Sequence, residues 1–427
     1  MTRWKKLWPY LLGATLLASL ATLVAVNLMP PEKAIDRQIE RLYDTSDPQF
    51  RRSMGVLLGP SILPGNRVDT LVNGVQIFPA MLEAISGARH SITFETYIYW
   101  EGAIGQAFAT RLAERARAGV RVHVLLDWVG SARMEESLLA TMMNAGVEIE
   151  RYHPLRWYHL GRVNNRTHRK SLVIDGQVGF TGGVGIADKW DGNAHDPDHW
   201  RDTHYRVRGP VVAQMQATFL DNWTKVRGEV LHGLRYFPPL EPAGPAAAQM
   251  FMSSPTGGSE SMQLMYLLSI ASAASTIDIA SAYFVPDELT RNALVATAKR
   301  GVRIRVLLPG PIIDAKTVRR ASRADWGPLL EAGIAIHEYQ PTMFHCKVMV
   351  VDGRMSSVGS TNFDNRSFRL NDESNLNVYD DAFAKEQIAI FEKDLAQSRQ
   401  VTLAQWQARP WHEKLLEWMA STISAQL

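Results

Sequence analysis

The sequence predicts an α/β protein made of two similar halves and preceded by a single membrane-spanning helix. Three observations support this prediction: one long apolar segment near the N-terminus, a set of short motifs that occurs twice in the same order, and strand-like runs that alternate with helix-like stretches in each copy. Such alternation is typical of a largely parallel sheet that is covered by helices.

The composition is that of an ordinary globular protein with a large core. Of the 427 residues, 46% are hydrophobic and 21% are charged, which excludes a disordered chain, a collagen-like fibre and a polytopic membrane protein. The length leaves room for two or three domains. The net charge is only +3, so the composition does not indicate a general nucleic-acid binder. The single cysteine, Cys346, excludes an intrachain disulfide and a cysteine metal cluster.

The N-terminal segment predicts a membrane anchor over residues 1–31. Residues Leu11–Met29 are almost wholly apolar, and a spanning helix needs about 20 such residues. Three basic residues precede this run, so the positive-inside rule places the N-terminus in the cytoplasm and the bulk of the chain outside. A cleaved signal peptide is the alternative, but no small-x-small cleavage site stands near the end of the apolar run. We therefore favour an uncleaved anchor.

The rest of the chain reads as an internal repeat. The strand-like run Ile92–Tyr99 and the segment Ala118–Leu126 correspond to Ile277–Val285 and Arg300–Leu308 in the second copy. Equivalent glycines in the two copies lie 182 and 187 residues apart. The constant order and the nearly constant offset indicate a duplication.

Proline- and glycine-rich stretches and the ends of the repeat set the expected domain boundaries. The expected units are the anchor 1–31, a linker 32–63, a first domain 64–237, a linker 238–258, a second domain 259–405 and a C-terminal amphipathic helix 406–427. That last helix either packs on the domain or lies on a bilayer with its two tryptophans at the interface. Extra residues of the first copy, within Leu155–Thr167, predict a loop at the mouth of a site.

Each copy carries the pattern His-x-Lys-x-x-x-x-Asp. The motif residues are His168, Lys170 and Asp175 in the first copy and His345, Lys347 and Asp352 in the second. The apolar residues between lysine and aspartate indicate a strand, on which positions i and i+2 share a face, so each histidine lies beside its lysine. An imidazole serves as nucleophile or proton carrier near neutral pH, and an ammonium group beside it stabilises a phosphoryl oxygen. With two copies, one histidine can attack phosphorus while the other acts as acid and then as base, and no metal is required.

The paired motif resembles the HKD signature of the phospholipase D superfamily, and the resemblance covers nearly everything from about Pro64 onward. The stretches Ser281–Asp287, Trp200–His204 and Gly359–Ser367 are similar to the bacterial cardiolipin synthase branch. The resemblance implies two similar phospholipase D-type α/β domains related by pseudo-twofold symmetry, with no metal and no other cofactor. It also implies that the motif residues form the active-site set, with the first histidine as nucleophile and the second as acid and base.

The resemblance implies roles for four residues outside the motif. Ser360 and Asn362 match residues close to the phosphate. Glu373 matches a carboxylate that orients a catalytic histidine, and Asp202 is its expected counterpart in the first copy. The first copy departs from the pattern at Gly185, which stands where the second copy has Asn362, so one amide donor to the phosphate site is missing.

Some polar residues have a structural interpretation. The motif aspartates are expected to bond turn amides or the neighbouring strand. His195, Asp196, Asp198 and His199 suggest a metal site, but the resemblance favours loop residues that line the cleft. The basic run Lys316–Arg323 is either a solvated helix face or a patch that steers anionic lipid.

Together these features predict a membrane-anchored phosphatidyltransferase of cardiolipin synthase type that works through a phosphohistidine. The implied partners are a membrane and an anionic phospholipid substrate similar to phosphatidylglycerol, and no nucleic acid is expected. The implied location is a bacterial inner membrane, crossed once, with the catalytic part on the extracytoplasmic side. Two alternatives stay open: a phospholipase D-type hydrolase of lipid or nucleic acid, and a catalytically silent membrane scaffold.

Overall fold

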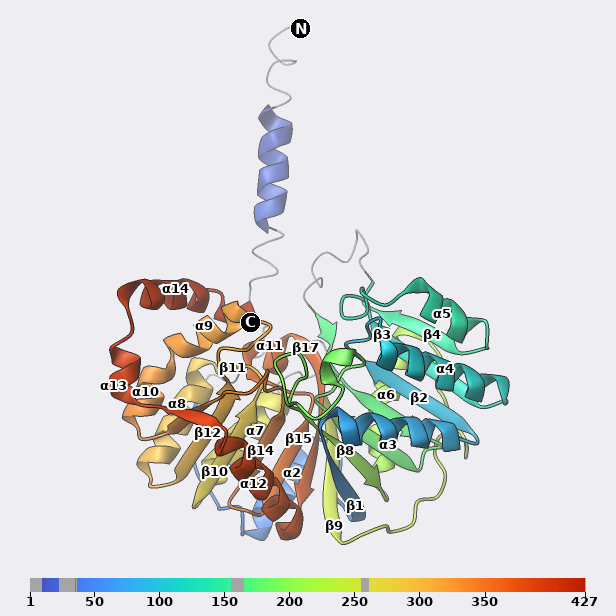
Figure 1. Cartoon of the computed structure of the whole chain (residues 1–427). Coiled ribbons are helices and arrows are strands. Elements are labelled where there is room, and N and C mark those ends of the chain that lie inside the picture. Colours follow the sequence, from blue (N-terminus) through green and yellow to red (C-terminus); the bar gives the residue numbers. More distant parts are fainter. Residues whose placement is uncertain (1–9, 23–34, 36, 155–164, 255–260, 427) are drawn as a thin grey trace, which may run out of the picture.

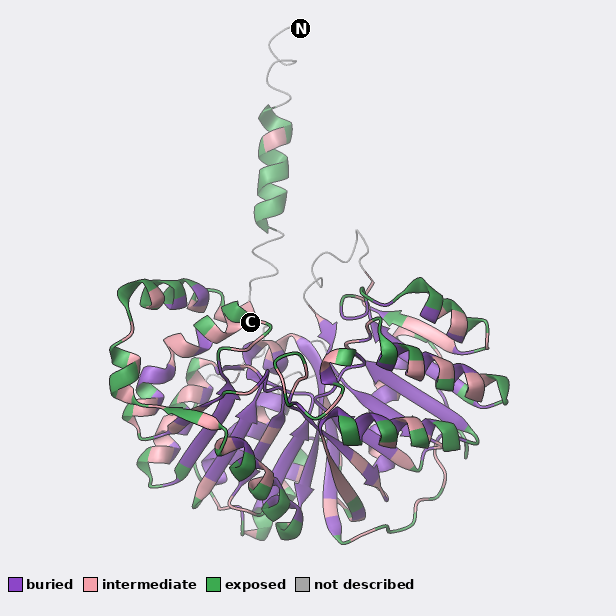
Figure 2. Cartoon of the chain, in the orientation of Figure 1, coloured by how far each residue is buried: buried purple, intermediate pink, exposed green. Residues whose placement is uncertain are grey.

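The protein is a broad α/β body, seen in a computed structural model that describes residues 10–22, 35, 37–154, 165–254 and 261–426 (Figure 1). Within these residues, one sheet of 16 strands runs through both halves of the chain. Helices cover both faces of the sheet, and Figure 2 shows that the central strands are buried along most of their length.

Between residues 37 and 237, the described part of the chain contains five helices and eight strands. The helices are α2 (Pro48–Leu57), α3 (Asn73–Gly87), α4 (Ala103–Arg117), α5 (Glu136–Met143) and α6 (Val212–Arg227), with a short 3-10 turn η2 (Asp188–Trp190). The strands are β1 (Leu63–Val72), β2 (Ser91–Thr96), β3 (Arg121–Asp127), β4 (Glu148–Tyr152), β5 (Arg166–Thr167), β6 (Ser171–Ile174), β7 (Val178–Gly182) and β8 (Thr203–Arg208).

The second half repeats this arrangement with additions at its C-terminal end. Its strands are β9 (Ala246–Ser253), β10 (Thr276–Ser281), β11 (Phe284–Val285), β12 (Arg303–Pro309), β13 (Ala335–Tyr339), β14 (Lys347–Val351), β15 (Met355–Gly359), β16 (Phe363–Asp364), β17 (Asn371–Tyr379) and β18 (Ser398–Val401). Its helices are α7 (Ser261–Ser272), α8 (Glu288–Lys299), α9 (Lys316–Ala324), α10 (Trp326–Glu331), α11 (Asn365–Arg369), α12 (Asp381–Leu395), α13 (Leu403–Gln407) and α14 (Trp411–Ser421), followed by η3 (Ser424–Gln426).

The strand order is the same in both halves when it is read from each outer edge toward the centre. It is β4-β3-β2-β6-β7-β8-β1 in the first half and β13-β12-β10-β14-β15-β17-β9 in the second, with β18 beyond β13. The three outer strands of each series are parallel, and the others pair antiparallel. Strands β1 and β9 meet at the centre, where Leu63 lies opposite Ala248. The predicted α/β fold with a two-domain repeat is therefore confirmed.

Apolar residues with helical spacing attach the outer helices to this sheet. In α4, the buried side chains Ile104, Phe108 and Leu112 recur every four residues and so lie on one face. The Phe108 ring stacks on Phe94 of β2 and meets Phe78 of α3 edge-on. Packing of this kind fixes the strands whose ends carry the site.

Two predicted linkers are wrong over part of their length. Residues 246–253 form β9, a buried strand between β17 and β1, because the run is apolar although prolines and glycines flank it. Residues 48–57 form α2, whose Phe50 and Met54 pack into the core of the second half. The predicted C-terminal helix is also divided, since α13 begins at Leu403 and Pro410 precedes a separate α14.

Residues 10–22 form an exposed helix that stands apart from the body (Figure 1). Among the described residues, no helix is both long enough and apolar enough to cross a membrane. The remainder of the predicted anchor, and most of the loop predicted within Leu155–Thr167, lie outside the described residues.

Candidate active site

Each motif histidine stands just before a strand and is held there by the opposite half of the molecule. The backbone N–H of His168 donates to the carbonyl of Asp372 at 2.9 Å, and the adjacent β5 pairs in parallel with β17. In the same way, the N–H of His345 donates to the carbonyl of Arg201 at 2.8 Å. This exchange of backbone contacts brings two segments that are distant in sequence to one place.

The first histidine is oriented by a carboxylate of the second half. Nδ1 of His168 lies 2.8 and 3.0 Å from the two carboxylate oxygens of Glu373, and the hydroxyl of Ser360 donates to the same carboxylate. Burial, followed by the charges of Lys170 and Lys347, lowers the pKa of His168 well below its usual value. A neutral ring that donates Nδ1–H to Glu373 has its lone pair on Nε2, where a nucleophile needs it.

The second histidine is oriented by a carboxylate of the first half. Nδ1 of His345 lies 2.7 Å from Oδ2 of Asp202, which also accepts the indole N–H of Trp190 at 3.0 Å. Burial raises the pKa of Asp202, but the contacts with His345 and Lys347 outweigh burial and lower it below the usual value. The carboxylate is therefore ionised, and it can stabilise a protonated imidazole.

The motif lysines are buried beside their histidines. Nζ of Lys170 donates to the carbonyl of His168 at 2.7 Å. Nζ of Lys347 donates to the carbonyl of His345 at 2.8 Å and lies 3.3 and 3.4 Å from the two ring nitrogens. Burial lowers the pKa of both ammonium groups, so an anion between the motifs would favour their charged forms.

One cavity of about 360 Å³ joins the two motifs. Its lining residues come from both halves and are Tyr97, Ile98, Trp100, Arg166, His168, Lys170, Trp190, Trp200, Tyr283, Asp314, Val318, His345, Asn362, Asp364, Arg366, Asn371 and Gln426. Oδ1 of Asn362 is buried without a hydrogen-bond partner in the described part of the protein, so it can accept a hydrogen bond from a donor on a ligand, such as a hydroxyl.

The glycine that replaces this asparagine in the first copy has a steric reason. A Cβ atom at Gly185 would lie 2.6 Å from Cβ of Ile98. No side chain fits there, so the position of the first copy that matches Asn362 carries no amide.

The motif aspartates lie away from the cavity, at the far ends of β6 and β14. The carboxylate of Asp175 accepts the backbone N–H groups of Arg89, His90 and Ser91 at 2.7 to 3.2 Å. Asp352 accepts the N–H groups of residues 274–276 in the same manner. The structure thus brings together eight of the ten predicted site residues and separates these two, which tie β6 to β2 and β14 to β10.

Other residues with a predicted role lie on the periphery. Ligand atoms of His195, Asp196 and His199 lie within 4.8 Å of one another on a loop of which His195 is exposed. On α9, Arg319 is paired with Glu338, and Arg323 with Glu417 at 3.2 Å.

Several lining residues were not predicted from the sequence. The ring of Tyr97 lies 5.2 Å from the ring of His168, and the hydroxyl of Tyr283 donates to Asp314 at 2.7 Å. Tyr97 directly follows β2 and Tyr283 lies two residues after β10, which are equivalent strands of the two halves, and this equivalence is the signal that would have found them. Arg366 stands within the stretch Gly359–Ser367 that carries the family resemblance, and Arg166 within the segment Leu155–Thr167 that was predicted to be a loop. Nothing in their spacing indicates that they face one cavity.

Two histidines from related domains, each oriented by a carboxylate, facing one cavity and standing beside a buried lysine, define a phosphodiester-transfer site of phospholipase D type. A family model described as "Cardiolipin synthase, PLD-like domain" matches residues 81–219 and 266–395. The chain therefore belongs to the phospholipase D-like family of cardiolipin synthases, and the resemblance seen in the sequence is confirmed.

Relatives and solved structures agree with this membership. A cardiolipin synthase from Geobacillus sp. (strain WCH70) is 37% identical over 84% of this chain and 72% of the relative. Cardiolipin synthase A from Pseudomonas putida (strain GB-1) is 36% identical over 82% and 73%. The crystal structure of phosphatidylserine synthase from Haemophilus influenzae Rd KW20 covers 89% of this chain and 100% of its own, with a TM-score of 0.69 and 13% identity, which supports the fold.

Proposed function

We propose that the protein is a phosphatidyltransferase of cardiolipin synthase type that passes a phosphatidyl group from one anionic phospholipid to the headgroup hydroxyl of another. The observation that supports this most is the crossed pairing of His168 with Glu373 and of His345 with Asp202 at one cavity. The cardiolipin synthases among its relatives support the substrate class.

In the first half-reaction, Nε2 of His168 attacks the phosphorus of a phosphatidylglycerol-like donor. The new P–N bond forms as the P–O bond to the leaving glycerol breaks, and His345 gives its Nε2 proton to the departing oxygen. The ammonium groups of Lys170 and Lys347 and the side-chain N–H groups of Asn362 stabilise the charge that builds on the phosphoryl oxygens.

In the second half-reaction, the hydroxyl of the acceptor lipid gives its proton to Nε2 of His345 and attacks the phosphorus. The P–N bond breaks and His168 is restored. Glu373 and Asp202 hold the two rings in the tautomer that each step needs.

The membrane anchor is part of this proposal. The helical residues 10–22 expose large apolar side chains, among them Leu12, Leu16 and Leu20. Helix α14 also exposes Trp411 and Trp418, and it lies at the same end of the body as that helix (Figure 1). We therefore propose a single-pass anchor in a bacterial inner membrane, with the body on the extracytoplasmic side and α14 at the bilayer surface.

Product analysis with phosphatidylglycerol vesicles tests the proposed function. The full chain is expected to release glycerol and form cardiolipin, and His168→Ala is expected to form none. Phosphatidic acid without cardiolipin would show a hydrolase instead, and undiminished turnover in His168→Ala would show that the chemistry lies elsewhere.

A further inference from the structure

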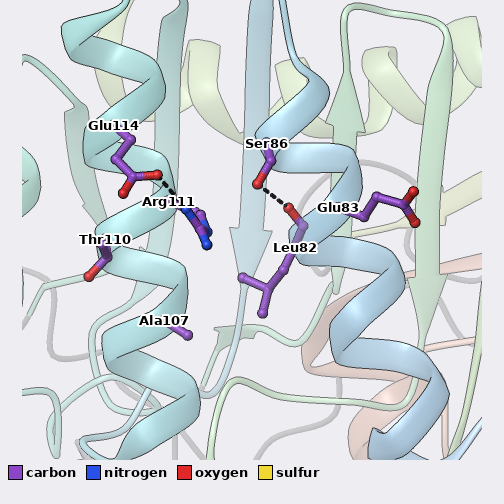
Figure 3. Close-up of a pocket in the computed structure, with 7 residues that line it drawn as sticks. All are labelled: Leu82, Glu83, Ser86, Ala107, Thr110, Arg111 and Glu114. Carbon is purple, nitrogen blue, oxygen red and sulfur yellow. Dashed lines mark hydrogen bonds and ion pairs between the residues drawn. The ribbon is translucent and has the colours of Figure 1, made fainter.

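Two arginines from opposite halves line the cavity that holds the histidines. Arg166 belongs to β5 in the first half, and Arg366 belongs to α11 in the second. Neither residue belongs to the histidine–lysine motifs. A separate hollow between α3 and α4 (Figure 3) is lined by charged residues that already pair, since Arg111 and Glu114 lie 2.7 Å apart.

The guanidinium of Arg166 is buried without an ion pair in the described part of the chain. The residue is 9% exposed, and Nη1 donates to the carbonyl of Asn165 at 2.8 Å. The acid that acts on it through space is Asp127, but the carboxylate of Asp127 accepts the backbone N–H groups of Val129, Gly130 and Thr167. A buried cation that lacks a direct counterion favours the binding of an anion.

Arg366 adds a second positive charge to the same space. Its guanidinium donates to the carbonyl of Gln426 at 3.2 Å, at the C-terminal edge of the cavity. Burial lowers the pKa of Arg166, and the charge of Arg366 contributes to this lowering, which means that the two cations repel each other across the cavity. An anion between them would turn this repulsion into attraction, and planar guanidinium groups suit phosphate oxygens.

This pair of arginines is separate from the groups that surround the reacting phosphorus. Arg166 precedes His168 by two positions in an extended segment, so the two side chains share a face and stand roughly 7 Å apart along the chain. A three-carbon headgroup can bridge such a span between a hydroxyl at the phosphorus and its own phosphate.

We propose that Arg166 and Arg366 form a second anion site, which holds the phosphodiester of the acceptor phospholipid while the donor phosphorus lies between the histidines. The inference rests on the proposed function and names the group that selects the acceptor. Water and simple alcohols lack this phosphate, so the site favours transfer to an anionic lipid alcohol over hydrolysis.

Competition between acceptors tests the second anion site. Phosphatidylglycerol vesicles in the presence of ethanol give cardiolipin when the acceptor is the lipid and phosphatidylethanol when it is the alcohol. Both products pass through the same first half-reaction, so their ratio isolates the choice of acceptor. We expect Arg166→Gln and Arg366→Gln each to lower the cardiolipin to phosphatidylethanol ratio about tenfold, as the loss of one charged hydrogen bond predicts.

Control variants separate selection from folding. Arg354→Gln, an exposed arginine in the turn between β14 and β15, is expected to leave the ratio within about twofold of the wild-type value. Arg166→Lys keeps the charge but loses the planar fork, so its ratio is expected to lie between those of the wild type and Arg166→Gln. Thermal unfolding establishes that each variant is folded before its products are measured.

The outcomes are distinct. An unchanged ratio in both glutamine variants overturns the inference, and so does an equal fall of both products, which would assign the arginines to the donor phosphate. Inorganic phosphate could change the rate of the wild type but not that of Arg166→Gln, and leave the cardiolipin to phosphatidylethanol ratio unchanged. That result would overturn the inference and indicate a site for free phosphate only. A wild-type protein that forms phosphatidylethanol but no cardiolipin contradicts the proposed function itself.

Discussion

The two histidine–carboxylate pairs are built alike but differ in the ionisation of the carboxylate. The pKa of Asp202 is held below its usual value by His345 and Lys347 despite burial, whereas burial raises the pKa of Glu373. An ionised partner stabilises an imidazolium, which suits His345 to carry the proton. Burial and the charge of Lys347 lower the pKa of His345, whereas the pKa of His168 lies well below its usual value, which suits His168 as the neutral nucleophile. The duplicated site therefore has two specialised halves.

A difference at one position of the repeat accompanies this specialisation. Gly183 and Ser360 are equivalent, since each follows the last residue of a strand paired with the carboxylate-bearing segment. A Cβ atom at Gly183 would lie 2.2 Å from Oδ1 of Asp202, so the glycine makes room for that carboxylate. In the second half the serine is retained, and its hydroxyl donates to Glu373.

Substitution of either histidine by alanine is expected to have the largest effect on kcat. His168→Ala is expected to lower kcat by at least about 10⁴-fold because the covalent path is lost, and His345→Ala by about 10²- to 10⁴-fold because a proton carrier is lost. With a donor that has a p-nitrophenol leaving group, His345→Ala is expected to regain release of the leaving group, which needs no proton. Recovery in His168→Ala instead would reverse the assignment.

Substitution of each carboxyl group by its amide, Asp202→Asn or Glu373→Gln, is expected to lower kcat by about 10²- to 10⁴-fold, since each ring loses its orienting acceptor. The effect on stability differs between the two. Asp202→Asn is expected to lower the free energy of unfolding at pH 7, because an ionised, stabilised group is lost. Glu373→Gln is expected to keep or raise it, because burial of a carboxylate is relieved. Chemical denaturation checks this, and equal destabilisation by both variants would contradict the comparison.

Substitution of the motif aspartates is expected to lower the free energy of unfolding and to leave kcat per folded molecule unchanged. Asp352→Ala is expected to cost about 2–4 kcal/mol in the free energy of unfolding, because three backbone donors lose a charged acceptor. Asp175→Ala is expected to cost less, since Asp352 also accepts the hydroxyls of Thr45 and Ser275. Urea unfolding measures the difference in the free energy of unfolding between the two variants. A kcat per folded molecule that falls as far as in His345→Ala would contradict this prediction and show that the aspartates take part in the reaction.

The smallest expected effect is a pH dependence that differs between the carboxylate variants. The pKa of Glu373 is raised on folding, so the wild type gains stability relative to Glu373→Gln as pH falls from 8 toward the unfolded value of about 4.5. The pKa of Asp202 is lowered on folding, so the deficit of Asp202→Asn persists over that range and shrinks only below about pH 3.8. Parallel curves for the two variants would contradict this difference.

The sequence was sufficient for the repeat, the motifs and the family, because matched strand patterns and a paired motif are local signals. It did not indicate which histidine each carboxylate serves. Glu373 lies 28 residues after His345 yet contacts His168, because β5 of the first half pairs with β17 of the second. In the same way, Arg201, just before β8, pairs with Phe344, next to His345. Strand β9 was missed because its flanking prolines resemble those of a linker, and the facing arginines are related only by the folded sheet.

The most direct test of the account is to trap the covalent intermediate and map it. Wild-type protein that is quenched during turnover of phosphatidylglycerol is digested and analysed by mass spectrometry under conditions that preserve phosphoramidate. The account predicts a phosphatidyl group on His168 of the wild type and no phosphatidyl-enzyme in His168→Ala. A modified His345, with His168 unmodified, would contradict the assignment of the two halves.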